Sequence, residues 1–242
     1  MDPSAYREMA ETEDRHWWFT GRRAILSSLI ERLPLRHPAR ILEIGCGTGG
    51  NLDMLARFGD VAAMEADAAA RAIAAEKTAG RFDIRAGRCP DAIPFPAGSH
   101  DLVCLFDVLE HIEEDVATLR AVRSLLAPGG RALITVPAYR WLWSTHDEFL
   151  HHKRRYTARE LRAKSLEAGL GIAVLSYFNT LLFPLAASAR LKDRLFDATR
   201  ASGTAMPPRA LNALFHRLFS VERVLVGRLP LPFGVSIVCV LR

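Results

Sequence analysis

The stretch Ile41-Leu42-Glu43-Ile44-Gly45-Cys46-Gly47-Thr48-Gly49-Gly50 indicates how the chain is organised. Its first four residues are typical of a short buried strand, and four glycines follow within six positions. Leu52 and Leu55 then recur at helical spacing. The stretch therefore predicts a strand, a glycine-rich turn and a helix. In this arrangement the backbone can approach a cofactor, because no Cβ atom intervenes.

The glycines of this turn fit two patterns. Gly45, Gly47 and Gly50 spell the dinucleotide-binding pattern G-x-G-x-x-G, with Glu65 about 20 residues further on as an acid for a ribose. Read from Glu43, the same turn spells E-x-G-x-G-x-G. A single G-x-G-x-x-G is weak evidence, so the rest of the chain has to decide between the two interpretations.

Beyond the turn, the chain alternates between strand and helix patterns, as a parallel α/β sheet requires. The strands are expected at 39–44, 61–65, 81–86, 101–107, 132–136, 172–178 and 235–241. The helices between them are expected at 67–79, at 112–126, and from the capping box Thr157-x-x-Glu160 to Gly169.

Five segments within residues 39–136 resemble, in order and spacing, the motifs of a class I methyltransferase that uses S-adenosylmethionine (SAM). They are the glycine turn from Glu43, Glu65 at a strand end, Ile93–Val103, Phe106-Asp-Val-Leu-Glu-His-Ile112 and Leu126-Ala-Pro-Gly-Gly-Arg-Ala-Leu-Ile134. An NAD-binding domain has no reason to carry the last two. The segments His16-Trp-Trp-Phe19 and His146-Asp-Glu-x-x-x-His-x-Arg-Arg-Tyr156 resemble a bacterial subgroup of the same family.

The resemblance implies a doubly wound, mostly parallel, Rossmann-like sheet of seven strands, with SAM as cofactor and S-adenosylhomocysteine as product. Residues 1–38 are then an N-terminal helical cap, 39–178 the SAM-binding α/β core, 179–234 a helical insertion between the last two strands, and 235–242 the final strand. Within the cap, residues 4–33 are expected to be helical with an interruption near Thr20-Gly21.

The chemistry of SAM and the resemblance together predict the cofactor-binding residues. Backbone amides of the glycine turn are expected to face the methionine part, which the resemblance implies Glu43 helps to orient. Glu65 is the expected acceptor for two ribose hydroxyls, since a carboxylate has two accepting oxygens. The turn residues concerned are Gly45, Cys46, Gly47 and Gly49.

Two further cofactor contacts are expected at the ends of later strands. Many relatives hold the adenine amine with an Asp after the third strand, but this chain has Gly87-Arg88-Cys89-Pro90 there. Backbone groups of Arg88 and Cys89 are the expected substitute. Asp107 closes the fourth strand, where ligands bind in open α/β sheets, and is expected to contact the SAM amino group or the substrate.

The segment from His146 to Tyr156 is the best supply of catalytic groups. Methyl transfer is an in-line displacement that depends mostly on proximity, and a base is needed only when the acceptor arrives protonated. The predicted catalytic residues are His146, Asp147 and, from the earlier motif, His111. Alternatives stay open: His111 as a structural hydrogen-bonding group, and the whole segment as a solvated surface loop.

Substrate binding is expected from both ends of the core. Arg154 and Arg155 are predicted to grip an anionic group, with Tyr156 beside them. Trp17 and Trp18 are interpreted either as an aromatic lid over the substrate mouth or as a staple that pins the first helix to the sheet. Metal binding by His146, Asp147 and a following histidine fits no strong signature, so no metal is expected.

The insertion is far longer than a hairpin requires. One helical face carries Leu211, Leu214, Phe215, Leu218 and Leu225, and residues 180–234 contain eight Arg or Lys against three Asp or Glu. Two interpretations compete. The helices cap an acceptor pocket or form a homodimer surface, or they lie on an anionic membrane to reach a lipid-linked acceptor.

The net charge, the cysteine pattern and the hydropathy of the chain limit the kinds of function to be considered. A net charge of +5 allows an anionic partner, but the chain shows neither a recognition module nor a long basic patch, so no nucleic acid is expected. The four cysteines have no C-x-x-C pair, and no signal sequence or membrane span is seen. A cytoplasmic location is expected, with peripheral contact to the inner face of the membrane if the second interpretation holds.

The sequence therefore predicts a SAM-dependent methyltransferase acting on an oxygen or nitrogen atom of a small-molecule or lipid-linked acceptor. The alternative from another class is a non-catalytic SAM-binding regulatory or assembly protein. An NAD-dependent oxidoreductase is the more distant alternative.

Overall fold

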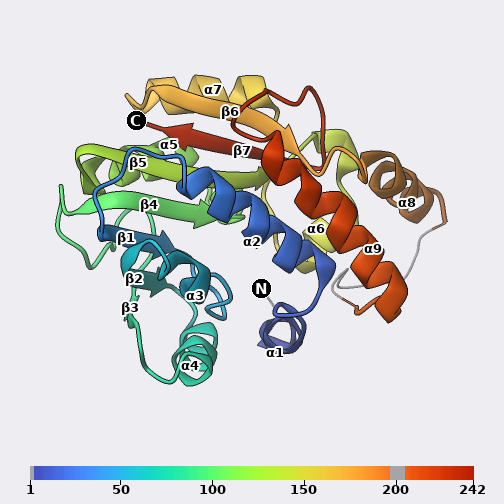
Figure 1. Ribbon diagram of the computed structural model, residues 1–242, viewed down its shortest axis with the longest axis horizontal. Helices are drawn as coiled ribbons and strands as arrows, with labels where there is room; N and C mark the ends of the chain where they lie inside the picture. Colours follow the sequence, from blue (N-terminus) through green and yellow to red (C-terminus); the bar gives the residue numbers. More distant parts are fainter. Residues whose placement is uncertain (1–2, 197–204) are drawn as a thin grey trace.

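A seven-stranded sheet organises the computed structural model, which describes residues 3–196 and 205–242 (Figure 1). The strands lie in the order β3-β2-β1-β4-β5-β7-β6. Only β7 runs antiparallel to its neighbours. The strands are β1 (Ala39–Ile44), β2 (Gly59–Glu65), β3 (Asp83–Ala86), β4 (His100–Phe106), β5 (Leu126–Pro137), β6 (Ile172–Phe178) and β7 (Ser236–Leu241).

Helices cover both faces of this sheet, which confirms the predicted doubly wound fold (Figure 1). The α-helices are α1 (Pro3–Thr12), α2 (Trp17–Ile30), α3 (Leu52–Leu55), α4 (Ala68–Lys77), α5 (Asp115–Leu125), α6 (Thr145–Phe149), α7 (Ala158–Glu167), α8 (Phe183–Phe196) and α9 (Arg209–Ser220). Three short 3₁₀ turns are η1 (Leu109–His111), η2 (Arg140–Leu142) and η3 (Val221–Val224).

The core forms two apolar layers, one on each face of the sheet. On one face, Val122 of α5 and Leu161 of α7 pack with Leu105 of β4. On the other, Ile25 of α2 packs with Cys104 of β4. Every residue of β4 is buried, as its continuous apolar sequence predicts for a central strand covered on both sides.

Chain order reverses between β1 and β4, because β2 and β3 extend the sheet on one side and β5 on the other. In open α/β sheets, ligands bind at the carboxyl ends of the strands beside such a reversal. The glycine turn follows β1 and Asp107 follows β4, so the topology brings both to this position.

The N-terminal helices differ from the expectation. The predicted interruption near Thr20-Gly21 is wrong, because α2 runs unbroken from Trp17 to Ile30. The break precedes it, where the His16 side chain accepts a hydrogen bond from the Trp18 amide and caps the new helix. Gly21 serves packing instead: a Cβ atom there would lie 2.5 Å from the ring of Phe219 in α9.

The insertion between β6 and β7 contains α8 and α9, although its residues 197–204 lie outside the described part of the chain. α9 lies alongside α2 (Figure 1). The Asn212 side chain of α9 accepts a hydrogen bond from the Trp17 amide at 2.9 Å. Within the described ranges, no helix combines the length and apolar character needed to cross a bilayer.

Candidate active site

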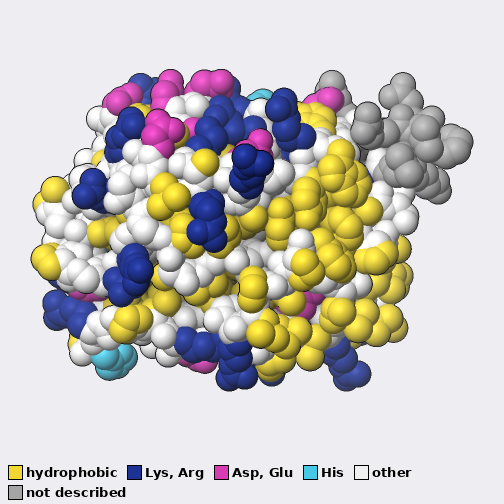
Figure 2. All heavy atoms as spheres, turned by 90° about the horizontal axis from the view of Figure 1, so that it is seen from above, with side chains coloured by type: hydrophobic (Ala, Val, Ile, Leu, Met, Phe, Trp, Pro, Cys, Tyr) yellow, Lys and Arg dark blue, Asp and Glu magenta, His cyan; other side chains and the backbone are white. Residues whose placement is uncertain are grey.

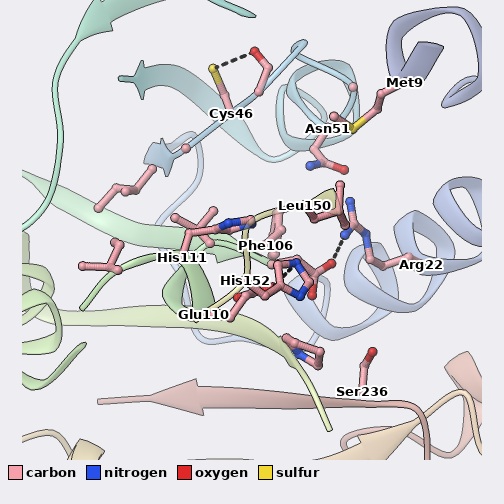
Figure 3. A pocket seen from close by; sticks show the side chains of 18 of the residues that line it. Met9, Arg22, Cys46, Asn51, Phe106, Glu110, His111, Leu150, His152 and Ser236 are labelled. Carbon is pink, nitrogen blue, oxygen red and sulfur yellow. Dashed lines mark hydrogen bonds and ion pairs between the residues drawn. The ribbon is translucent and has the colours of Figure 1, made fainter. Parts of the chain in front are cut away.

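A cavity of about 810 Å³ lies at the carboxyl ends of β1, β2, β4 and β5 (Figure 3). The glycine turn and the end of β2 line one end of it. η1, the α6 segment and the α8 residues Ala186 and Arg190 line the other. Residues of α1 and α2, among them Tyr6 and Arg22, complete the wall. Elements from the whole chain therefore enclose one space with two chemically different ends.

The glycine turn brings bare backbone to this cavity. Gly45 and Gly47 have φ values of +69° and +55°, which side-chain-bearing residues adopt with strain. A Cβ atom at Gly45 would lie 2.7 Å from Val108, whereas a Cβ at Gly47 would enter space free of other atoms within 4 Å. Gly47 thus leaves open a volume that a ligand can fill.

Glu65 at the end of β2 is fixed by backbone amides. One of its carboxylate oxygens accepts from the Gly47 amide and the other from the Asp67 amide, both at 2.9 Å. Each oxygen keeps accepting capacity for a further donor. Tyr6 of α1 lies close by, and its pKa is raised to about 12 by burial and by the negative charges of Glu65 and Asp67.

Glu43 lies beneath the turn and is fully buried. Its Oε1 accepts a hydrogen bond from Asn51 at 2.8 Å, while its Oε2 has no partner among the described residues. Burial raises the pKa of this carboxyl to about 8, although the Asn51 hydrogen bond and the positive charge of Arg22 oppose the rise. Without a ligand, Glu43 is therefore a weakened acid with one unsatisfied oxygen.

An ion pair in the cavity wall joins α2 to the residue that follows β4. The Arg22 guanidinium donates to Asp107, whose other oxygen accepts from the Thr135 hydroxyl at 3.1 Å. Asp107 has a φ of +56°, and the Arg22 Nε–H has no partner within the described ranges. The pair sets a cation and an anion side by side, complementary to a ligand that carries both charges.

Glu13 fastens the N-terminal helices over the glycine turn. Its Oε1 accepts from the Thr48 hydroxyl at 2.8 Å and from the Lys77 ammonium at 2.7 Å. Glu13 also lines the cavity. The segment between α1 and α2 therefore contributes to the cavity wall.

At the opposite end, Glu110, His111 and His152 lie together, and we call them the acceptor-end cluster (Figure 3). The two imidazole rings are 4.7 Å apart, and His152 Nε2 is 4.0 Å from Glu110 Oε1. One ligand atom from each residue lies within 4.8 Å of the other two, close enough to hold one cation between them. No metal was expected from the sequence, and this cluster differs from the set considered there.

Burial shifts the pKa values of two members of the cluster toward their uncharged forms. Glu110 is completely buried and neither carboxyl oxygen has a hydrogen-bonding partner in the described part of the chain. Burial raises the pKa of Glu110 well above its ordinary value. It lowers the pKa of His111 to about 3, with a further contribution from His152. Both shifts favour the uncharged forms, and at neutral pH the His111 imidazole is neutral.

His152 is held by Asp147, which is itself fully buried. Asp147 Oδ1 lies 2.9 Å from His152 Nδ1 and accepts from Arg155 Nε at 2.7 Å; Oδ2 accepts from the Ser144 amide and from Arg155. Burial opposes ionisation of Asp147, but the hydrogen bonds from His152 and Arg155 hold its pKa well below the ordinary value. An ionised carboxylate on Nδ1 favours the tautomer in which His152 Nε2 is a free acceptor.

The comparisons with known proteins agree with this geometry. Residues 18–217 match the family model described as a methyltransferase domain. This chain belongs to that family. It is a SAM-dependent methyltransferase of class I, and SAM is its cofactor.

Two curated relatives and one solved structure are typical of the similarities. A ubiquinone biosynthesis O-methyltransferase of Xanthomonas axonopodis pv. citri is 30% identical over 173 residues, which cover 64% of this chain and 72% of the relative. A protein of Mycolicibacterium smegmatis, described as a probable S-adenosylmethionine-dependent methyltransferase, is 28% identical, covering 66% and 61%. A Haloferax volcanii methyltransferase solved with the activator Trm112 has a TM-score of 0.63 at 19% identity, covering 97% and 92%. This last similarity concerns the fold alone.

The glycine-turn end of the cavity of this methyltransferase fits SAM. The open volume at Gly47 and the fixed carboxylate of Glu65 suit the methionine backbone and the ribose diol. Arg88 and Cys89 also line the cavity there, and burial raises the pKa of the Cys89 thiol to about 12, so it stays neutral. Cys46 is likewise buried in the lining.

Two of the three predicted catalytic residues lie in the cavity wall. His111 and His146 line the cavity, whereas Asp147 lies outside the lining and bonds His152. Burial and the nearby charge of Arg190 lower the pKa of His146 to about 3, which makes it a poor base. His152, which has no catalytic role in the sequence-based prediction, lines the cavity as well.

The predicted substrate-binding arginines are engaged elsewhere. Arg154 bonds Asp115 at 2.9 Å and lies outside the cavity lining, and the Tyr156 hydroxyl donates to the same carboxylate at 3.0 Å. Arg155 lines the cavity, yet its guanidinium is bound by Asp147. In the structure these side chains fix the loop that carries His152, and their grip on an anionic group stays a prediction.

Both tryptophans lie in the cavity wall, and the aromatic lid over the substrate mouth stays a prediction. Trp17 and Trp18 line the cavity, and they also pack on α9. Trp18 stacks on Phe219 with ring centroids 5.1 Å apart. Sequence reasoning missed the site residues Tyr6, Glu13 and Arg22. The signal for Arg22 was an arginine pair directly after the aromatic segment.

Proposed function

We propose that this methyltransferase methylates a hydroxyl oxygen of an acceptor bound between the glycine turn and the acceptor-end cluster. The observation that carries the proposal is His152 in the cavity lining, held through Nδ1 by the ionised and buried Asp147 so that Nε2 is left to accept a proton. A hydroxyl has to lose its proton during transfer, so it requires a base at this point. The similarity to ubiquinone biosynthesis O-methyltransferases supports oxygen as the acceptor atom.

Different residues along the cavity bind SAM and the acceptor. Bound SAM supplies a methyl carbon made electrophilic by a positively charged sulfur. Amides of the glycine turn and Glu65 hold its methionine and ribose parts, and the Arg22–Asp107 pair suits its carboxylate and amine. Trp17 and Trp18 reduce access of water and so strengthen these charged contacts.

The proton moves at the opposite end. Nε2 of His152 accepts the proton of the acceptor hydroxyl while the oxygen is aligned for in-line attack. Asp147 then stabilises the imidazolium through Nδ1–H. In the protonated form that burial favours, Glu110 offers an O–H donor that can orient the acceptor.

The test uses purified protein, methyl-labelled SAM and a protein-free extract of the source cells. The labelled product is isolated, and mass spectrometry with NMR identifies the atom that carries the new methyl group. An O-methyl product is expected, and a Gly47→Asp variant, whose side chain enters the open volume of the turn, should form none. An N-methyl product, or SAM binding without any labelled product, would contradict the proposal.

A further inference from the structure

α9 presents its apolar side to solvent. Its polar residues Asn212 and His216 face α2, where Asn212 bonds the Trp17 amide and His216 Nδ1 lies 2.9 Å from the Thr20 hydroxyl. On the outer side, Leu214 is 50% exposed, with Leu211 and Leu218 beside it. An amphipathic surface helix normally buries this stripe. The sequence predicts Phe215 on the same apolar face, but in the structure its ring packs inward against Trp17.

The exposed stripe extends beyond α9. Val221 and Leu225 continue it at helical spacing through η3, and Leu185 of α8 is 54% exposed on the other helix of the insertion. Figure 2 shows hydrophobic side chains gathered over one end of the molecule, with Lys and Arg side chains around them. We call Leu185, Leu211, Leu214, Leu218, Val221 and Leu225 the insertion face. A concentration of exposed apolar side chains like this marks an interaction site.

The exposed charged side chains within 179–190 and 205–234 are all positive. Arginines 209, 217, 223 and 228 are exposed. Within 179–190 and 205–234 the sole carboxylate is Glu222, which is 1% exposed because it accepts from the amides of Asn179, Thr180 and Leu181. Exposed leucines surrounded by arginines without exposed acids complement an anionic bilayer, whose surface attracts cations and whose interior accepts apolar side chains.

A second copy of this chain fits the same surface poorly. A two-fold symmetric dimer would place the patch against itself, and the arginines around it would meet arginines. Like charges brought together in an interface cost binding free energy. Within 179–190 and 205–234 the one carboxylate, Glu222, is buried and does not offset that repulsion.

The insertion face also connects to the cavity. Ala186 lines the cavity, while its neighbour Leu185 is exposed on the insertion face. Both belong to α8, so one helix forms part of the cavity wall and part of the outer apolar surface. An apolar acceptor that leaves a bilayer beneath this face has a short path to the cavity.

We propose that the insertion face docks on an anionic lipid bilayer and that the acceptor is a lipid or a lipid-linked hydroxyl compound taken from it. The docking proposal rests only on the exposed side chains of the insertion face and the arginines around them. The identity of the acceptor rests on the proposed function and narrows its substrate class.

The test measures co-sedimentation of the whole protein with vesicles of phosphatidylcholine alone or of equal parts phosphatidylcholine and phosphatidylglycerol, at low and high salt. Binding is expected to the anionic vesicles only and to fall with salt. A Leu214→Glu/Leu218→Glu variant should lose at least tenfold in vesicle affinity. Arg217→Gln should lose about fivefold on anionic vesicles.

The matched control is Leu166→Glu, since Leu166 of α7 is equally exposed on the opposite face of the sheet. It should bind vesicles like the unaltered protein. Equal loss in this control, absence of binding to anionic vesicles, or a dimer that Leu214→Glu dissociates would overturn the docking proposal. SAM affinity of each variant, measured by calorimetry, shows that the fold is retained.

The acceptor is tested separately by partitioning the labelled methylation product between lipid and aqueous phases. Label in the lipid phase, reduced in the Leu214→Glu/Leu218→Glu variant, is expected. Label in the aqueous phase would refute the lipid acceptor while leaving O-methylation intact. Docking needs neither SAM nor His152, so a His152→Asn variant should still sediment with anionic vesicles. The two proposals can therefore fail independently.

Discussion

Replacing Glu43 by Gln should stabilise the SAM-free protein at pH 8 and have a much smaller effect at pH 5. In the unfolded chain this carboxyl ionises near pH 4.5, but burial raises its pKa to about 8 in the folded protein. Between these two values the unfolded state gives up a proton that the folded state keeps. Stability is therefore fully present below pH 4.5 and is lost as the pH rises toward 8. A neutral glutamine removes this dependence.

The expected size follows from the pKa difference. One pKa unit corresponds to about 1.4 kcal/mol, so the advantage of Gln should grow by roughly 3 kcal/mol between pH 5 and pH 8. For a chain of this length that is about 6–12 °C in Tm. Thermal unfolding of the SAM-free proteins at both pH values measures it, with Glu76→Gln at an exposed position of α4 as the control. An equal change in Tm at both pH values would refute a buried, weakened Glu43.

Three further predictions concern packing, cofactor binding and the acceptor-end cluster. Gly21→Ala should lower stability by about 1–3 kcal/mol in thermal unfolding, because its Cβ would lie 2.5 Å from Phe219; unchanged stability would show that the helices adjust freely. Arg22→Gln should weaken SAM about tenfold in calorimetry by removing the charge paired with Asp107; unaltered affinity would exclude the pair from cofactor binding. Chelation with EDTA should leave methylation unchanged, whereas a loss restored by a divalent cation would assign the acceptor-end cluster to metal binding.

The sheet and the glycine turn were predictable because local patterns specify them. The strands at 39–44 and 172–178 have the expected bounds, since their apolar residues are bordered by turn signals. β5 begins at Leu126, well before the expected 132, because Leu126 already pairs with His100 across an irregular register. The Pro128-Gly129-Gly130 segment predicts the end of the preceding helix, but it does not indicate that β5 has already begun.

The acceptor end of the cavity was less predictable because it depends on tertiary contacts. The loop from Asp147 to Tyr156 is fixed by Asp115 and by η1, more than thirty residues earlier in the chain. Without those contacts, His146 and His152 are equivalent candidates in the sequence. In the fold, His152 bonds a buried carboxylate, whereas His146 Nδ1 has no partner within the described ranges.

Helical periodicity likewise predicts that a helix of the insertion carries an apolar stripe, but it does not predict which way the stripe faces. The apolar spacing from Leu211 to Leu225 was visible in the sequence, but which side of α9 faces α2 was not. Asn212 and His216 decide it, because they find hydrogen-bonding partners in Trp17 and Thr20. When a helix packs against polar groups, its polar residues therefore indicate its orientation as well as its leucines do.

The most direct measurement compares His152→Asn with His151→Asn in methyl transfer from labelled SAM to the isolated acceptor, with SAM affinity measured in parallel. His151 is the adjacent histidine, exposed and outside the cavity lining, so its variant should keep full activity. His152→Asn should lower the rate about 10²–10⁴-fold, the usual contribution of a general base, while SAM binds unchanged. Equal rates in the two variants would contradict a base at His152, and with it the assignment of the acceptor-end cluster as the place where the hydroxyl is deprotonated.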